Sequence, residues 1–182
     1  MFNMFFLCNN KQMPNQSIRE CDRCVAIAKS GSRCRNRTCK GRKCWIHTKR
    51  DEGLRIKPSQ ILNAGQGLYA TKRFAKGDRI ADYTAEKLTR AQVDNRYPGN
   101  VTAEYVLCRS DRECFDGRRT NSSFARFSND ARGSAQFNNN ARFTPGAHNR
   151  QPIMRAGRVI TAGVEIFTNY GGGGYWNNNN AQ

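Results

Sequence analysis

The chain has 182 residues, 37% of them hydrophobic, and a formal net charge of +17. That length fits one domain plus a small module, and the apolar content suffices for a core. The charge exceeds what solubility requires and predicts attraction to nucleic acid, an acidic protein surface or anionic lipid. Lipid is the least favoured, because the apolar residues 1–8 are too short to span a bilayer and lack a signal peptide's leading positive charges. We expect an intracellular protein with no membrane partner.

A cysteine-rich segment over residues 21–50 follows an N-terminal extension over residues 1–20. It contains five cysteines and one histidine: Cys21, Cys24, Cys34, Cys39, Cys44 and His47. A segment this short, polar and basic cannot bury enough apolar surface to fold unaided, so it needs a metal ion or disulfides. A tetrahedral zinc site needs four thiolate or imidazole ligands, and the Cys44-Trp-Ile-His47 spacing lets one turn supply two of them.

Spacing alone leaves the other ligand pair open, since Cys24 with Cys34 and Cys21 with Cys24 are both candidates. The run resembles small zinc modules that read Cys, a short polar turn with Gly, Cys, then Cys-x-x-His. This resemblance favours a structural Zn²⁺ on Cys24, Cys34, Cys44 and His47. Two disulfides are the alternative, and an intracellular location disfavours them. The remaining cysteines have no ligand spacing and are expected to be ordinary thiols: Cys8, Cys108 and Cys114.

Positive charge is densest in the N-terminal part of the chain. Residues 1–57 hold 14 Lys and Arg against 4 Asp and Glu, whereas residues 58–182 hold 17 against 10. The basic side chains of the module are Arg33, Arg35, Arg37, Lys40, Arg42 and Lys43. On a small rigid unit they suit contact with nucleic-acid phosphates without base readout. Trp45 is a candidate stacking surface, but packing against the metal site is the arrangement we expect for it.

A second unit is predicted over residues 54–176, and an Asn-rich tail over residues 177–182 follows it. Glycine-bounded runs with alternating polarity predict many short strands and few helices. The expected strands cover residues 53–56, 79–83, 104–108, 113–116, 157–161 and 165–170, with a turn entering a strand at 63–70 and a hairpin connection at 74–78. A helix of one or two turns is expected over residues 89–95, with Thr89 as its cap.

The stretch from Ala162 to Trp176 has the form of a strand that ends in a tyrosine and runs into a glycine hinge. Glu165 to Phe167 predict the strand, and Tyr170 stands at its end. Gly171 to Gly174 allow backbone conformations closed to other residues. A tyrosine held beside a flexible segment is a candidate for chemistry, and a core tyrosine before a linker is the alternative.

Three motifs in a fixed order are far more specific together than any one alone. They are GxGxxA at Gly65 to Ala70, ARFSN at Ala125 to Asn129, and EIFTNYG starting at Glu165. In order and separation they resemble the motifs of SET-domain protein lysine methyltransferases, most closely the compact viral and protist forms. The resemblance covers about Leu54 to Trp176. The GQG alone is weak, because no strand-to-helix dinucleotide unit follows it.

The resemblance implies a mainly β fold, the SET-domain β-clip. In that fold small curved sheets surround a C-terminal pseudoknot, where the Asn129 segment passes through a loop made by the last strand. The chain would thus combine this domain with the small N-terminal zinc-stabilised module. The resemblance also implies S-adenosylmethionine as cofactor and a protein lysine as substrate.

The same resemblance implies a role for each matching residue. The cofactor-binding residues would be Gly65, Gln66, Gly67, Leu68, Tyr69, Asn129, Asp130, Tyr170 and Trp176. The backbone of 66–69 would hold the methionine part, Asn129 and Asp130 would lie near the adenine, and Trp176 would cover its face. Tyr170 takes the family's catalytic position, and Tyr105 would help wall the channel for the substrate lysine.

Two functions of different classes follow. The first is a lysine methyltransferase acting on histone or another nucleic-acid-associated protein, in the nucleus or on chromatin, with the basic module docked on nucleic acid. The second is a nucleic-acid-binding or scaffold protein with a catalytically silent SET domain. Retention of Gly65, Gly67, Asn129 and Tyr170 favours the first. Asp130, where the family usually has histidine, and the high charge favour the second.

Overall fold

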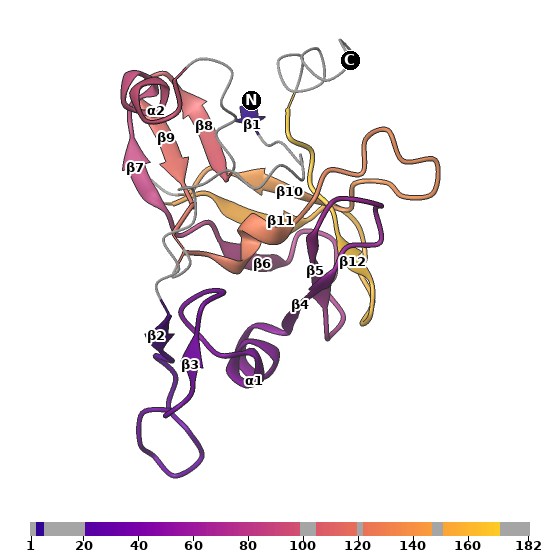
Figure 1. The fold of residues 1–182 in the computed structure, drawn as a ribbon. Coiled ribbons are helices and arrows are strands. Elements are labelled where there is room, and N and C mark those ends of the chain that lie inside the picture. The colour runs from indigo at the N-terminus through magenta and orange to yellow at the C-terminus, as the bar shows by residue number, and fades with distance from the viewer. Residues whose placement is uncertain (1–2, 6–20, 99–104, 120–121, 147–150, 172–182) are drawn as a thin grey trace.

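The computed structural model describes residues 3–5, 21–98, 105–119, 122–146 and 151–171 (Figure 1). The strands in this part of the chain are β1 (Asn3–Phe5), β2 (Asp22–Arg23), β3 (Arg37–Thr38), β4 (Leu54–Pro58), β5 (Gln66–Ala70), β6 (Arg79–Asp82), β7 (Glu86–Leu88), β8 (Val106–Ser110), β9 (Glu113–Asp116), β10 (Ala141–Thr144), β11 (Ile153–Ala156) and β12 (Glu165–Ile166). The helical segments are α1 (Trp45–His47), the π-helical η1 (Thr48–Glu52), α2 (Arg90–Arg96) and the 3-10 turn η2 (Phe124–Phe127). The protein is mainly β, as the sequence predicts.

Three small antiparallel sheets build the body of the protein. Their strand orders are β1-β8-β9-β7, β10-β11-β6 and β12-β5-β4. The N-terminal module, residues 21–50, adds a two-stranded ribbon of β2 and β3. Figure 1 shows this ribbon projecting from one end of the body, with α1 next to β4. No helix in the described ranges is both long and apolar enough to cross a bilayer.

Local signals in the sequence give several elements correctly. Strand β9 has the predicted bounds, and Thr89 caps α2. The cap is a capping box, in which Thr89 Oγ1 accepts from the Gln92 amide at 3.3 Å and Gln92 Oε1 accepts from the Thr89 amide at 2.8 Å. This reciprocal pairing satisfies two donors that a helix start otherwise leaves free.

The strand predicted over residues 157–161 is wrong. The strand lies earlier, in β11, where Met154 and Ala156 face the core. Gly157 then leaves the ladder, and its amide donates to the Asn140 carbonyl at 2.8 Å. Within 157–161 a single bridge remains, between Ile160 and Phe74. The chain turns here because β11 finds its partners, β10 and β6, before residue 157.

Two segments distant in sequence run side by side as the expected pseudoknot requires. Parallel bridges join Asn129 to Phe167 and Ala141 to Thr168. The Thr168 amide donates to the Asn129 carbonyl at 2.8 Å, and Asn140 Nδ2 donates to the Glu165 carbonyl at 2.7 Å. These bonds hold the Asn129 segment against the strand that leads to Tyr170.

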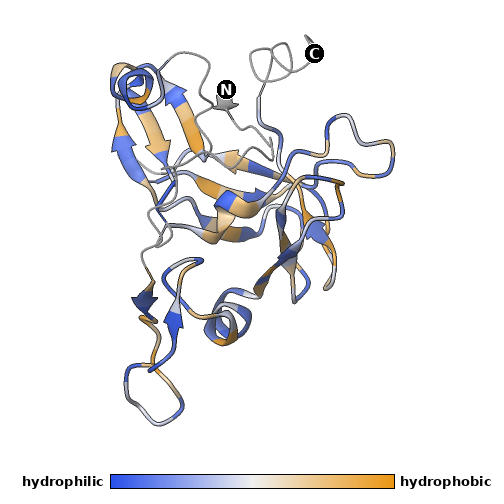
Figure 2. Cartoon of the chain, viewed as in Figure 1, coloured by the Kyte–Doolittle hydropathy of each residue, from blue (hydrophilic) through white to orange (hydrophobic). Residues whose placement is uncertain are grey.

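The body and the module have very different interiors. The main core joins apolar side chains from all three sheets, among them Leu54, Leu68 and Met154, each 0% exposed. The module's own buried cluster is Cys24, Ala26, Cys34 and Cys44. Figure 2 accordingly shows hydrophobic segments on the body strands, while β2 and β3 are hydrophilic. The module therefore lacks the apolar core that stabilises the body.

Four cysteines form disulfides in the structure, which corrects two expectations. Cys108 and Cys114, expected as ordinary thiols, are bonded to each other. They face each other in the β8–β9 pairing, which sequence spacing alone does not reveal. In the module Cys21 is bonded to Cys39, so Cys21 is not available as a metal ligand. Cys8 lies outside the described residues.

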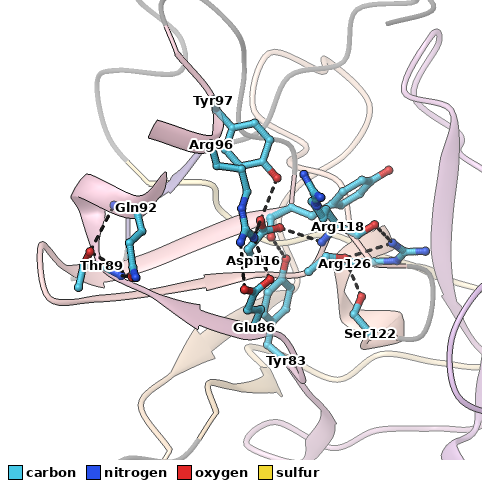
Figure 3. Close-up of polar contacts among 12 residues, drawn as sticks. Tyr83, Glu86, Thr89, Gln92, Arg96, Tyr97, Asp116, Arg118, Ser122 and Arg126 are labelled. Atoms are coloured by element: carbon cyan, nitrogen blue, oxygen red, sulfur yellow. Dashed lines mark hydrogen bonds and ion pairs between the residues drawn. The ribbon is translucent and has the colours of Figure 1, made fainter. Parts of the chain in front are cut away.

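A polar network anchors α2 to the adjoining sheet (Figure 3). Asp116, 1% exposed, accepts from Arg96 Nη1 at 2.8 Å and from the Tyr97 hydroxyl at 2.9 Å. Arg96 also pairs with Glu86 at 2.8 Å.

Arg126 is a buried cation near this network. It donates to the backbone carbonyls of residues 117–119, while its Nε has no partner among the described residues. Burial lowers the pKa of this guanidinium.

Gly41 and Lys40 are two of the module residues that contact the body. Gly41 lies directly against the Phe124 ring, because a Cβ at this position would come within 2.5 Å of the ring. Lys40 Nζ donates to Gln66 Oε1 at 3.4 Å, which joins the module to the start of β5. Lys43 pairs with Asp51 at 3.1 Å and Glu52 at 2.6 Å in the connecting segment.

Candidate functional site

Asn129 connects the three motifs. It follows η2, and its side chain is 7% exposed. Its Nδ2 donates to the Gln66 carbonyl at 3.0 Å, which links it to the glycine motif. Its Oδ1 lies 3.4 Å from the Tyr170 hydroxyl, which also donates to the Ser128 carbonyl at 3.1 Å. Residues predicted from separate parts of the sequence therefore meet at one point.

Asp130 orders the backbone around Tyr170. Its carboxylate accepts from the Tyr170 amide at 2.8 Å, and its other oxygen accepts from Arg132 N and Asn139 Nδ2, each at 2.8 Å. The Asp130 side chain is fully buried, with the Arg132 guanidinium 3.8 Å away. Asp130 thus acts on the site through its side chain as well as its position in the backbone.

Glu165 is a buried carboxylate next to Asn129, with Oε1 3.5 Å from Asn129 Nδ2, and the sequence analysis assigned it no role in the site. It is 0% exposed and accepts from Ser59 Oγ at 2.7 Å, the Gln60 amide at 2.7 Å and the Tyr69 hydroxyl at 2.9 Å. Gly67 is required beside it, because a Cβ there would lie 2.1 Å from Glu165 Oε1. Burial and this carboxylate raise the pKa of Tyr69. The sequence offered one signal for this role, namely an acidic residue inside the apolar run VEIF, because a buried charge needs partners.

A cleft of about 480 Å³ opens at this meeting point. It is lined by residues 60–64, by part of 129–137 and by Tyr170. Of the predicted cofactor residues, Asn129, Asp130 and Tyr170 line the cleft. Residues 65–69 do not line the cleft, and the preceding loop, residues 60–64, lines it instead. Trp176 lies outside the described residues.

The cleft fits a small polar organic molecule. Its volume is within the roughly 300–1,000 Å³ of small-molecule sites. Its lining combines amide, carboxylate and hydroxyl groups with the ring of Phe137. The residues present are therefore compatible with the cofactor implied by the motifs.

Tyr105 stands apart from this cleft. It was expected in a strand, but it precedes β8 and has a left-handed backbone with φ of 64°. Its carbonyl accepts from the Tyr83 hydroxyl at 2.6 Å. Its ring packs edge-on against Phe127 at 6.5 Å between centroids, with the Arg126 guanidinium 5.1 Å from the ring. Phe127 directly precedes Ser128, so Tyr105 approaches the Tyr170 region through that residue.

The module contains a second candidate site. Ligand atoms of Cys24, Cys34, Cys44 and His47 all lie within 4.8 Å of one another, and the four residues are buried. His47 Nδ1 is 3.2 Å from Cys44 Sγ and 3.5 Å from Cys24 Sγ. These four are the ligands favoured by the sequence, and this spacing suits a tetrahedral zinc ion. Trp45 does not pack here, since it is 69% exposed.

The Cys44 thiol is poised for ionisation. Burial opposes the thiolate, but hydrogen bonds from the His47 backbone, the Asn36 amide and the His47 ring outweigh it and lower the pKa of Cys44 to about 6. The Asn36 Nδ2 donor lies 3.6 Å from the sulfur. Because thiolate is the form that binds metal, this environment favours a ligand role.

Comparison with known proteins places these features in context. The SET domain family model matches residues 65–171, more than half of the chain. No curated protein sequence matches. Among solved structures, "Crystal structure of the Chaetomium Thermophilum polycomb repressive complex 2 (PRC2)" aligns with a TM-score of 0.55 and 22% identity. That alignment covers 66% of this chain and 15% of the other.

Two further structures give similar alignments over 66% of this chain and 15% of the other. "Structure of ctPRC2 in complex with H3K27me3 and H3K27M" aligns with a TM-score of 0.58 and 22% identity. "ctPRC2 in an autoinhibited conformation bound to S-adenosylmethionine" aligns with a TM-score of 0.55 and 23% identity. At these identities the likeness concerns the fold, and this chain spans a small part of each polycomb chain.

Proposed function

The chain belongs to the SET domain family, a family of lysine methyltransferases, and we propose that it is an S-adenosylmethionine-dependent protein lysine methyltransferase. The observation that carries the proposal is the convergence of the three motifs at Asn129, which lines the cleft. Asn129 bonds to the glycine motif and lies beside the Tyr170 hydroxyl, and both residues line the cleft. Such convergence of segments 63 and 41 residues apart supports a ligand site over three unrelated turns.

The cofactor would occupy the cleft, with Asn129, Asp130 and residues 60–64 as its contacts. S-adenosylmethionine supplies a methyl group on a sulfonium, which the substrate amine accepts by in-line transfer. The chain's own contribution is positioning and electrostatics. The Tyr170 hydroxyl oxygen lies 3.1 Å from the Ser128 carbonyl oxygen and 3.4 Å from Asn129 Oδ1. Such an oxygen cluster suits a polarised methyl group, whose C–H bonds are weak donors.

Tyr170 is the proposed catalytic residue. Its hydroxyl donates to the Ser128 carbonyl at 3.1 Å, and this bond would orient the phenol oxygen for the reacting groups. Tyr105 is proposed to wall the path of the substrate lysine, held by Tyr83 and Phe127. A water-poor path favours the neutral amine that the transfer needs. Trp176 is proposed to cover the cofactor's adenine.

We propose histone or another nucleic-acid-associated protein as the substrate, and the nucleus or chromatin as the location. One fold relative is described with H3K27me3, which motivates a histone H3 probe. The proposed division is a zinc module over 21–50 with Cys24, Cys34, Cys44 and His47 as ligands, and a SET domain over 54–176. Zinc would supply the cross-link that holds the module, with no part in methyl transfer.

Calorimetric titration with S-adenosylmethionine tests the proposal directly. The wild type should bind one equivalent, and Asn129→Ala should weaken binding at least tenfold by removing the side chain that joins the motifs. The matched control is Asn95→Ala, since Asn95 is exposed on α2 and lines no part of the cleft. No binding by the wild type would instead support the silent scaffold.

A further inference from the structure

A second concavity lies on the N-terminal module and shares no residue with the cleft. Its volume is about 480 Å³, and its lining is Asp22, Arg23, Val25, Arg33, Arg37 and Arg42. Four of these six residues are arginines, which we call the arginine cradle (Arg23, Arg33, Arg37 and Arg42). All four are exposed.

Reciprocal hydrogen bonds hold two of the guanidinium groups in place. Arg23 Nη2 donates to the Arg33 carbonyl and Arg33 Nη2 donates to the Arg23 carbonyl, each at 2.9 Å. The Nε atoms donate to the carbonyls of Cys34 at 2.9 Å and Cys24 at 3.1 Å. A guanidinium has five N–H donors, so each group keeps three for a ligand. Arg37 donates to the Cys21 carbonyl.

The cradle concentrates positive charge without compensation. The β2–β3 register sets Arg23 directly opposite Arg37, and like charges in that position repel. In the described part of the chain, no carboxylate lies within ion-pair distance of any cradle arginine, including Asp22 in the same lining. By contrast, Lys43 and Arg50 of the module each pair with Asp51. A bound anion would relieve this repulsion.

We propose that the arginine cradle binds backbone phosphates of nucleic acid. Planar guanidinium groups bind phosphate oxygens in pairs, and several arginines can then engage consecutive phosphates and release counterions. A phosphate backbone offers a regular row of charges to a chain of net +17. The exposed ring of Trp45 adds a stacking surface on the same module. The inference does not depend on methyl transfer.

The cradle depends on the metal cluster beneath it. The carbonyls that fix Arg23 and Arg33 belong to Cys34 and Cys24, two of the proposed zinc ligands. Loss of the ion would free these backbone segments and with them the guanidinium groups. Nucleic-acid binding should therefore require the metal ion, although the proposed phosphate contacts are made by the arginines and not by the ion.

The experiment measures fluorescence anisotropy of a labelled 20-base-pair duplex DNA with the full chain, over a range of salt concentrations and without S-adenosylmethionine. The test variant is Arg37→Gln with Arg42→Gln, since neither side chain bonds to a metal ligand. The control is Arg55→Gln with Arg73→Gln, which removes equal charge from exposed positions of the body. Circular dichroism and zinc content report whether each variant is folded.

The cradle variant should lose at least tenfold in affinity, and its log–log salt slope should fall by about 1.8, or about 0.9 for each lost phosphate contact. The control should lose less than threefold. Equal losses in the two variants would overturn the proposal and leave only diffuse attraction. If the double variant misfolds, Arg42→Gln alone decides, because the Arg42 side chain makes no hydrogen bond to the described part of the chain and only its carbonyl is bonded, to the Val25 amide. The predicted slope change for this single variant is about 0.9.

Competitors identify the anion. A long unlabelled duplex should displace the probe, and millimolar pyrophosphate should compete only weakly. If pyrophosphate displaces DNA at micromolar concentration, or if a polyglutamate peptide of matched charge binds as tightly as the duplex, the assignment to a nucleic-acid backbone is wrong. Chelation of the metal should lower the affinity of the wild type to that of the cradle variant or below. Unchanged affinity after verified metal loss would refute the dependence on zinc.

Discussion

The body and the N-terminal module are stabilised by different means. The body buries Leu54, Leu68 and many other apolar side chains between its sheets. In the module, Val25, Ile27 and Trp45 are 39%, 54% and 69% exposed, and the buried cluster consists of three cysteines and one alanine. Apolar burial can therefore fold the body without help, whereas the module depends on its ligands. The two regions should be separable by experiment.

The largest effect is expected from Cys44→Ser combined with His47→Ala. Structural zinc contributes about 10–16 kcal/mol of apparent binding free energy in zinc-finger peptides, so its loss should unfold the module. Elemental analysis under reducing conditions should find one zinc per wild-type chain and none in the variant. The thermal transition of the body should persist. Cys114→Ser, a change at a buried cysteine of the body, should leave the zinc content unchanged.

The reverse separation is expected from Glu165→Ala. The change strands the donors of Ser59, Gln60 and Tyr69 in a buried site and leaves a cavity, with an expected cost of about 2–5 kcal/mol. Denaturant unfolding should report this loss in the body, while the zinc content stays at one. Glu165→Gln keeps one carbonyl acceptor and should cost less. Similar losses in the two variants would mean that the second carboxylate oxygen, and not the volume of the side chain, provides the stability.

Tyr170→Phe should separate chemistry from folding. We expect at least a tenfold fall in turnover on a histone H3 peptide, equivalent to about 1.4 kcal/mol of transition-state stabilisation. The melting temperature should change little, because the ring remains in the core. Tyr97→Phe removes the same atom from a residue of another core cluster and should retain activity. Near wild-type turnover of the Tyr170 variant would assign that residue to structure.

The smallest effect concerns the exposed end of the Asp116 network. A hydrogen bond from Arg96 depresses the pKa of Glu86 below its ordinary value. The associated stability is present above the unfolded pKa, about 4.3, and is lost as pH falls through the lower folded value. Glu86→Gln should cost about 0.2–1 kcal/mol at pH 7, and the difference from wild type should vanish near pH 3. A difference that grows on acidification would contradict this assignment.

Much of the architecture was predictable because its signals are local. The Thr89 cap needs only Gln92 three residues later, and strand β9 is a run of four residues with the predicted bounds. The Cys44-x-x-His47 spacing is likewise set within one turn. The order and separation of the three motifs were enough to predict the fold, because they reflect the path of the chain through the whole domain. Such features depend on residues that are close together in the sequence, so they can be predicted from the sequence alone.

Tertiary structure decided the features that join distant segments. The role of Glu165 requires Ser59, Gln60 and Tyr69, about 100 residues earlier, and the Cys108–Cys114 bond requires the β8–β9 register. The cleft lining at 60–64 and the turn at Tyr105 depend on which strands pair. Trp45 is exposed, whereas Cys24, Cys34, Cys44 and His47 are buried in the module's interior. Secondary-structure propensity and ligand spacing depend on a few neighbouring residues. Burial, and contacts between distant segments, depend instead on which segments the fold brings together.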